Sequence, residues 1–160
     1  MTLIIRPIQA KDLAIAHQVM MAAATAGETN DQQELLAYLS QYHENVSSLL
    51  SGPDLTQAIT LVAQMGNDIV GVAQLNGDGE IKLFYVTPEW QGRGIGRALL
   101  AELALNAQCS NIQRLQIYTS NAARLFFLAH GFHSEDKTFS EWLTADLTKW
   151  KILYEQQTTH

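Results

Sequence analysis

Three glycines at alternate positions, followed at once by an apolar periodic segment, constrain this chain more than any other feature. They stand in the stretch QGRGIG as Gly92, Gly94 and Gly96. Glycines at the junction of a strand and a helix let several backbone N–H groups point at one spot without side chains in the way. The first N–H groups of the helix and the positive end of its dipole add to this spot. The stretch therefore predicts a site for an anion such as a pyrophosphate, with Arg93 and Arg97 beside it.

Two common phosphate-binding motifs do not fit this stretch. A P-loop ends in Gly-Lys-Ser/Thr, whereas Gly96 is followed by Arg97 and Ala98. A dinucleotide-binding fingerprint has the spacing Gly-x-Gly-x-x-Gly, whereas the third glycine here comes one residue earlier. No acidic residue follows on a second parallel strand at the expected distance. The structural alternative is a turn that merely needs flexible residues.

The hydrophobic pattern predicts a single domain that mixes strands and helices. We expect strands over 2–8, 58–65, 68–75, 80–88 and 112–119, and helices over 10–27, 31–53, 95–108 and 121–130. Gly66 and Asn67 join two of the strands as a hairpin turn. Further strand signals are strongest over 149–156, and we interpret 135–146 as a connection between the last strands.

Composition narrows the class of protein. The 160 residues carry 16 acidic and 10 basic side chains, a formal net charge of −6, which argues against nucleic acid as a partner. Cys109 is the one cysteine, so neither an internal disulfide nor a thiolate zinc cluster can form. The five histidines show no paired metal spacing, and we expect no metal. The N-terminus has no signal or membrane segment, so we expect a cytoplasmic protein that does not bind membranes.

The glycine stretch and its surroundings resemble one enzyme family. QGRGIG is similar to the pyrophosphate motif Gln/Arg-x-x-Gly-x-Gly/Ala of the GNAT superfamily of N-acetyltransferases, and LFYVTPEW resembles the fourth strand of that fold. LQIYTSNAARLFFLAHGF resembles its fifth strand and fourth helix, and IIRPIQAKDLAIA its opening strand and helix. The resemblance implies one α/β (α+β) N-acetyltransferase domain over 1–160, with a mixed, mostly antiparallel central sheet flanked by about four helices.

The resemblance also implies a site and a co-substrate. The fourth and fifth strands would splay apart to admit the pantetheine arm of acetyl-CoA, with the Val86 N–H polarising the thioester carbonyl. Residues matching the acyl-CoA site are Phe84, Tyr85, Val86, Gln91, Gly92, Arg93, Gly94, Ile95, Gly96, Arg97, Ser120, Asn121 and Phe127. The acetyl group would pass directly to a primary amine of a small molecule or a protein. A homodimer remains an open alternative.

Catalysis rests on residues outside the glycine stretch. An alkylamine has a pKa of ~10.4 and must lose a proton, and Glu80 at the start of the fourth strand is the candidate base. Family members commonly carry a tyrosine four residues before a Gly-Phe pair, where it protonates the departing thiolate; here Phe127 occupies that position. The loop asparagine that family members often carry would fall on Ser120, and an asparagine, Asn121, comes one residue later. If the helix is aligned one residue later, so that Asn121 takes that position, Phe126 rather than Phe127 lies near the sulfur.

Neither phenylalanine can donate a proton, so Tyr118 and Ser120 are the candidate replacements. Glu28, Asp31 and Glu141, in loops that border the acceptor site of the superfamily, are candidates for binding a cationic acceptor, with Glu135 and Asp136 nearby. Two alternatives stay open. One is an acyl-CoA-binding module with little catalysis, and the other is a longer acyl donor accepted beside a phenylalanine.

Overall fold

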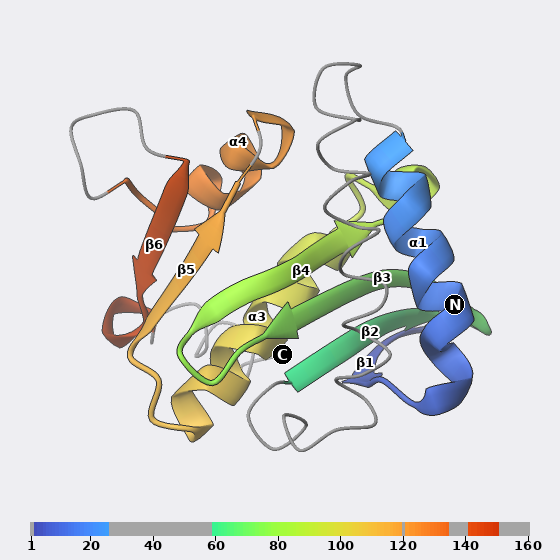
Figure 1. Cartoon of the computed structure of the whole chain (residues 1–160), viewed down its shortest axis with the longest axis horizontal. Helices are drawn as coiled ribbons and strands as arrows, with labels where there is room; N and C mark the ends of the chain where they lie inside the picture. The colour runs from blue at the N-terminus through green and yellow to red at the C-terminus, as the bar shows by residue number, and fades with distance from the viewer. Residues whose placement is uncertain (1, 26–58, 120, 135–140, 151–160) are drawn as a thin grey trace.

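The computed structural model describes residues 2–25, 59–119, 121–134 and 141–150, which form one six-stranded sheet with helices on both faces (Figure 1). The strands lie in chain order across the sheet: β1 (Leu3–Pro7), β2 (Ile59–Met65), β3 (Asp68–Leu75), β4 (Glu80–Val86), β5 (Arg114–Tyr118) and β6 (Trp142–Asp146). All neighbours pair antiparallel except β4 and β5, which are parallel. The mixed, mostly antiparallel sheet is confirmed.

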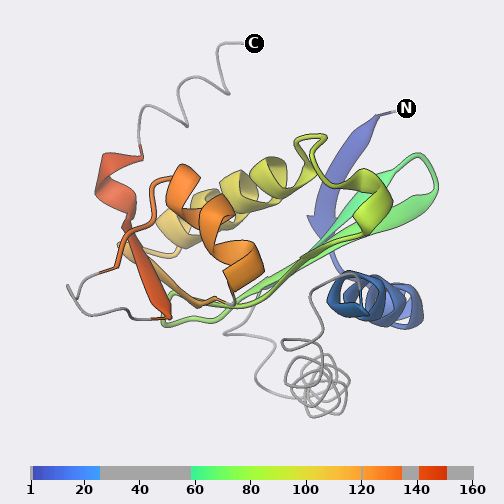
Figure 2. The ribbon, with the colours of Figure 1, turned by 90° about the horizontal axis from the view of Figure 1, so that it is seen from above.

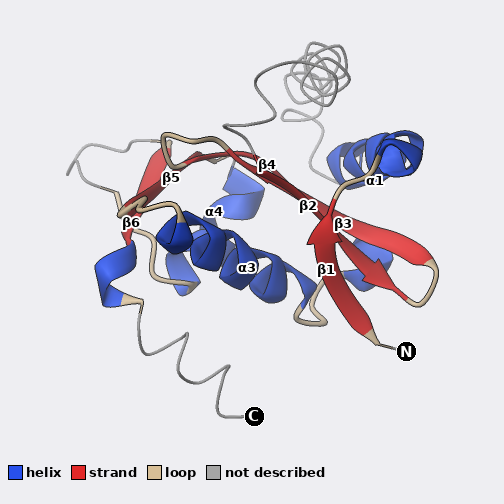
Figure 3. Cartoon of the chain, turned by 90° about the horizontal axis from the view of Figure 1, so that it is seen from below, coloured by secondary structure: helices blue, strands red, loops and turns tan. Residues whose placement is uncertain are grey.

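Three α-helices cover the sheet in the described residues: α1 (Leu13–Thr25), α3 (Ile95–Cys109) and α4 (Asn121–Ala129). Three short 3-10 turns accompany them: η1 (Ala10–Asp12), η3 (Pro88–Trp90) and η4 (Leu147–Lys149). Seen along the sheet, α3 and α4 lie on one face and α1 lies on the other (Figures 2 and 3). The predicted helix over 31–53, which would be a fourth, lies outside the described residues.

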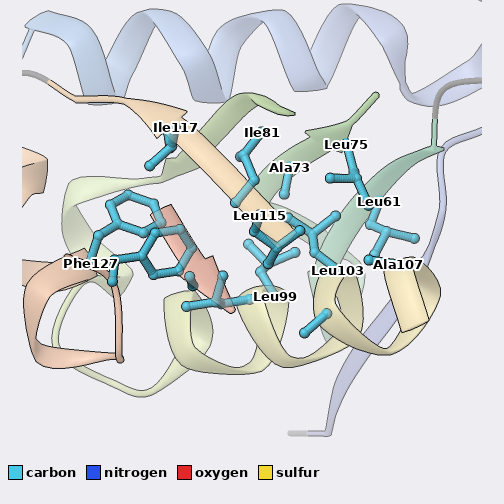
Figure 4. Close-up of a cluster of buried hydrophobic side chains, with 14 of the residues drawn as sticks. Leu61, Ala73, Leu75, Ile81, Leu99, Leu103, Ala107, Leu115, Ile117 and Phe127 are labelled. Carbon is cyan, nitrogen blue, oxygen red and sulfur yellow. The ribbon is translucent and has the colours of Figure 1, made fainter. Parts of the chain in front are cut away.

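The larger core lies between the sheet and α3. The predicted inner face of α3 is confirmed, since Ile95, Leu99 and Leu103 are each at most 1% exposed. They pack against β3 and β5 side chains such as Ala73 and Leu115 (Figure 4). Each buried leucine contributes about 1.5–3 kcal/mol relative to an exposed one, so this face fixes the start of α3 against the sheet.

The opposite face carries a smaller core and an ion pair that anchors α1. Ala16 and Val19 of α1 pack against Val62 and Val72. Just before α1, the Arg6 guanidinium of β1 binds Asp12 through two hydrogen bonds of 2.7 and 3.0 Å, and the Gln9 N–H donates to the same carboxylate at 2.8 Å. The hydrogen bonds from Arg6 are the main reason that the pKa of the buried Asp12 lies below its usual value.

The hairpin between β2 and β3 turns at Gly66 and Asn67 as predicted, with Met65 opposite Asp68. The interpretation of residues 135–146 as a connection was wrong for residues 142–146, which form a strand. The structure places β6 within the segment interpreted as a connection, because Leu143 and Ala145 enter the core while the strand pairs with β5. Lys149, at the start of the predicted strand over 149–156, ends a 3-10 turn instead, and residues 151–156 lie outside the described part.

Candidate functional site

The site begins where β4 leaves β5. The two strands pair only at their starts, Glu80 with Gln116 and Ile81 with Ile117. At this point the register of β4 against β3 shifts between Ile81 and Leu83, which marks a β-bulge. Because a bulge bends its strand and increases its twist, it turns the rest of β4 away from β5, as Figure 1 shows. The expected divergence of the fourth and fifth strands is present in the structure.

Hydrogen bonds to β3 show which backbone groups face the open edge of β4. The Thr87 N–H donates to the Val70 carbonyl at 2.9 Å, so Thr87 faces β3. Backbone groups of successive residues alternate in direction along an antiparallel strand, so Tyr85 also faces β3. Phe84 and Val86 therefore direct their N–H and C=O groups to the other edge, toward the gap in pairing with β5.

A polar side chain lies across this edge. Gln91 follows the η3 turn, and its Nε2 donates to the Val86 carbonyl at 3.0 Å. Sequence reasoning included Gln91 only for its backbone amide and missed this side-chain bond. The available signal was the position of Gln91, five residues after Val86 and directly after a short turn that begins with proline.

The glycine loop has the conformation that the alternate spacing predicts. Gly92 and Gly94 have φ angles of 75° and 85°, in the left-handed region that side chains disfavour. A Cβ added at either position would meet nothing within 4 Å, so backbone conformation rather than crowding requires glycine there.

The same loop leaves several amides available to a ligand. Gly94 is the N-cap of α3, and the Ala98 N–H makes a bond of 3.1 Å to its carbonyl. By helix geometry, the amides of residues 95–97 have no acceptor within the helix. Exposed Arg93 and Arg97 flank them, and the Arg93 guanidinium lies 4.8 Å from the ring centre of Trp90. Through this contact with Arg93, Trp90 is a second residue of the site that the sequence did not predict.

Gly96 has a different role from its two neighbours. A Cβ at this position would lie 3.2 Å from the Phe126 ring and 3.7 Å from Phe84. The absence of a side chain lets the first turn of α3 approach α4 and β4 closely. The anion-binding end of α3 is thereby held beside the open edge of β4.

Aromatic side chains fill the space between these elements. Phe127 is 1% exposed, with its ring centre 5.1 Å from those of Phe84 and Phe132, and it belongs to the core (Figure 4). Phe126 is half-buried, and its ring centre lies 5.5 Å from that of Phe84 and 4.3 Å from that of His130. Both phenylalanines therefore lie next to β4, Phe126 toward the glycine loop and Phe127 inside.

Two candidate catalytic residues lie apart from Val86. Glu80 begins β4, six residues earlier, which is about 20 Å along a strand, and its carboxylate pairs with Lys82 Nζ at 2.9 Å. Tyr118 is 57% exposed and packs edge-on against Trp142 at 5.5 Å. Its neighbour Ile117 enters the core that contains Phe127, so Tyr118 points to the other face of the sheet.

The remaining predicted residues are only partly described. Ser120, Glu28, Asp31, Glu135 and Asp136 lie outside the described residues. Asn121 is the first residue of α4, and its side chain is likewise outside the described part. Glu141 is exposed directly before β6, and its carbonyl accepts hydrogen bonds from the Thr119 N–H at 2.9 Å and Oγ1 at 3.2 Å.

Across residues 2–25, 59–119, 121–134 and 141–150, no group of three or more histidine, cysteine or acidic side chains could hold a metal ion. Within the same ranges, no helix has the length and hydropathy needed to cross a membrane.

Comparison with known families agrees with this geometry. The acetyltransferase (GNAT) domain family matches residues 30–144, and the chain therefore belongs to the GNAT acetyltransferase family. No curated protein sequence matches the chain significantly.

Solved structures share the fold at low sequence identity. A GCN5-related N-acetyltransferase from Rhodopseudomonas palustris is 24% identical with a TM-score of 0.76, over 91% of this chain and 96% of its own. The PaiA N-acetyltransferase from Thermoplasma acidophilum, solved with coenzyme A, is 19% identical with a TM-score of 0.75, over 91% of this chain and 99% of its own. A GNAT family acetyltransferase from Brucella melitensis, solved with acetyl-CoA, is 22% identical with a TM-score of 0.64, over 91% and 88%. At these identities the likeness establishes the fold.

Proposed function

We propose that this chain transfers an acetyl group from acetyl-CoA to a primary amine of a small molecule or a protein. The observation that carries the proposal is the open edge of β4 beside the amides at the start of α3. Family membership supports acetyl transfer, and two of the similar structures contain coenzyme A or acetyl-CoA. The acceptor class rests on the family resemblance.

The residues present suit acetyl-CoA as a substrate. Backbone amides from Gly92 to Arg97 would hold the pyrophosphate, since the surroundings of Gly92 and Gly94 are open and two arginines lie beside them. The Gln91 N–H, which the sequence also offered, already donates to the Pro88 carbonyl at 3.3 Å. The Phe84 and Val86 backbone would bind the pantetheine arm as a further strand is bound at a sheet edge. Acetyl-CoA supplies the acetyl group as a thioester, and its transfer forms an amide and releases the CoA thiol.

The chain contributes polarisation and positioning. The Val86 N–H donates to the acyl oxygen, where negative charge develops during attack by the amine, and such a donor is worth about 10²–10³ in rate. The neutral acceptor amine loses one proton as the amide forms, and that proton ends on the CoA sulfur; an acceptor that arrives as an ammonium first gives up one more proton to the solvent. Because Glu80 lies at the other end of β4 and pairs with Lys82, we assign it no direct contact with the amine at Val86.

The departing thiolate does not require a strong acid. A thiol has a pKa of ~8.5, so its anion leaves far more readily than an alkoxide would. The rate is therefore expected to be lower, by up to about 10²–10⁴, than with a positioned general acid. Glu141 and the net negative charge favour a cationic acceptor.

A second candidate function is an acyl-CoA-binding module with little catalysis. The specific observation in its favour is that Phe127, at the expected position of the acid, is buried in the core and has no hydroxyl. Both candidates bind CoA, whereas only the first releases thiol when an amine is added.

The test combines binding and turnover. Thermal unfolding is followed with CoA, acetyl-CoA and longer acyl-CoAs; a ligand at 100 times its Kd adds about 2.7 kcal/mol of stability. Thiol release is then measured with acetyl-CoA and a panel of amines, including lysine peptides. Stabilisation with thiol release supports the enzyme, and stabilisation without release supports the binding module. No shift with any CoA species contradicts both.

A further inference from the structure

The contact between Trp90 and Arg93 holds a charged side chain next to the glycine loop. The Arg93 guanidinium lies 4.8 Å from the centre of the Trp90 ring, within the range of a cation–π interaction. Trp90 is itself held in place, because its N–H donates to the Thr87 carbonyl at 3.0 Å and its half-buried side chain packs against the larger core. The ring is therefore a fixed support for the exposed arginine.

The neighbours of Arg93 in the chain do not restrict its side chain. Arg93 stands between Gly92 and Gly94, which have positive φ angles and no side chains that could limit its rotamers. An arginine that moves freely in the unbound protein loses side-chain entropy when a ligand fixes it. The contact with Trp90 removes part of this entropy in advance, so that a ligand meets the charge already in place.

The same contact leaves the binding groups of Arg93 available. A cation–π contact uses the positive charge of a guanidinium but none of its N–H donors, which can still bind oxygen atoms. Phosphate suits such a planar, charged group of donors. Because Arg93 lies between the two glycines of the loop, the phosphates nearest to it are those that the loop amides bind. For CoA these are the pyrophosphate and not the 3′-phosphate of the ribose.

We propose that Trp90 is a positioning residue that holds the Arg93 guanidinium beside the glycine loop for the pyrophosphate of CoA. This inference rests on the CoA-binding part of the proposed function and depends on neither the acceptor nor turnover. Arg97, the other arginine beside the loop, lies on α3, and it makes no cation–π contact within the described part of the chain. Trp90 therefore acts on binding through Arg93 alone.

A double-mutant cycle on Trp90 and Arg93 tests the proposal. Calorimetry gives the Kd of CoA and of 3′-dephospho-CoA for Trp90→Leu, Arg93→Ala, the variant with both changes, and the conservative Trp90→Tyr. Arg97→Ala, alone and combined with Trp90→Leu, is the matched control, since it removes an arginine outside the cation–π contact. Thermal unfolding shows that each variant is folded, and the larger apolar Trp90→Met takes the same place in the cycle if Trp90→Leu unfolds.

We expect Arg93→Ala to raise the Kd of CoA about 5- to 10-fold at low salt and Trp90→Leu to raise it about 2- to 5-fold. Once Arg93 is absent, Trp90→Leu raises Kd by less than about 1.5-fold, whereas its effect multiplies with that of Arg97→Ala. Trp90→Tyr stays within about 2-fold of the unmodified protein, because tyrosine also accepts a cation on its ring. Dephospho-CoA responds as CoA does.

Four results would overturn the proposal. An unchanged Kd in Trp90→Leu means that the contact has no part in binding, and an equal effect with and without Arg93 means that the ring acts on the shape of the loop. Tighter binding by Trp90→Leu means that the ring withdraws Arg93 from the ligand. An effect confined to CoA places Arg93 at the 3′-phosphate. If the unmodified protein binds neither ligand, the proposed function itself fails.

Discussion

Gly94, one of the two loop glycines with a positive φ, gives a quantitative prediction. In Gly94→Ala, a side chain enters open space, since nothing lies within 4 Å of the added Cβ. Steric collision is therefore absent, and the cost comes from φ alone. At a φ of 85°, an L-residue is less stable than glycine by about 1–2 kcal/mol.

This cost appears in one of two measurements. If the Gly94→Ala variant keeps the loop conformation in the free protein, the free energy of unfolding falls by about 1–2 kcal/mol, a Tm loss of about 2–8 °C at this chain length. If the free loop relaxes instead, its amides leave the ligand position, and the Kd of CoA rises about 5- to 30-fold. Because the bound state needs the same conformation either way, the two losses sum to about 1–2 kcal/mol.

Urea unfolding and calorimetric titration with CoA measure the two parts. Gly66→Ala is the matched control: Gly66 has a φ of 61° in the β2–β3 turn, so its substitution lowers stability but leaves the Kd of CoA unchanged. A summed loss below about 0.5 kcal/mol for Gly94→Ala refutes the reasoning from φ. An equal rise in Kd for Gly66→Ala refutes the placement of the ligand at the loop.

Three further predictions concern other parts of the molecule. Arg6 lowers the pKa of Asp12, so its stabilisation of the folded state is complete above the unfolded pKa of ~3.9 and is lost as pH falls through the lower folded pKa. Asp12→Asn therefore removes about 1.5–3 kcal/mol of unfolding free energy at pH 7 and flattens the acid dependence of urea unfolding; an unchanged pH profile would contradict this. Phe127→Tyr places a hydroxyl in the core and costs about 1–3 kcal/mol of unfolding free energy, while thiol release per folded molecule stays equal or rises; a large fall in release with intact acetyl-CoA binding would count against the alignment of α4. Arg97→Ala raises the Kd of CoA about 2- to 5-fold at low salt and less at high salt, and a salt-independent change would exclude a charge effect.

The parts of the fold that sequence predicts well carry their signal locally. The α3 helix is long, periodic and followed by polar residues, and the β2–β3 hairpin has a Gly-Asn turn between two apolar runs. β6 was not predicted, because it has only five residues and depends on pairing with β5, which lies far away in the sequence. Its side chains do not alternate between buried and exposed, since Leu143, Thr144 and Ala145 are all buried, so the period of two that marks a strand is absent from the sequence.

In the candidate site, too, features that depend on the local sequence were predictable, whereas features that depend on tertiary contacts were not. The glycine loop was predictable because alternate glycines express a backbone requirement that the sequence states directly. The face to which Tyr118 points was not, because it depends on which side of β5 meets the core, and neither was the ion pair between Glu80 and Lys82. The bond from Gln91 to Val86 required the η3 turn to fold the chain back, which only the tertiary structure shows.

The central claim is that acetyl-CoA binds along the open edge of β4 and on the amides at the start of α3. Titration of ¹⁵N-labelled protein with acetyl-CoA, followed by the backbone amide resonances, tests this claim most directly. The account predicts that the largest shifts fall on Phe84, Val86 and residues 92–97, while amides of the β2–β3 turn stay unchanged. Saturable binding whose largest shifts lie elsewhere, or no binding at all, would contradict it.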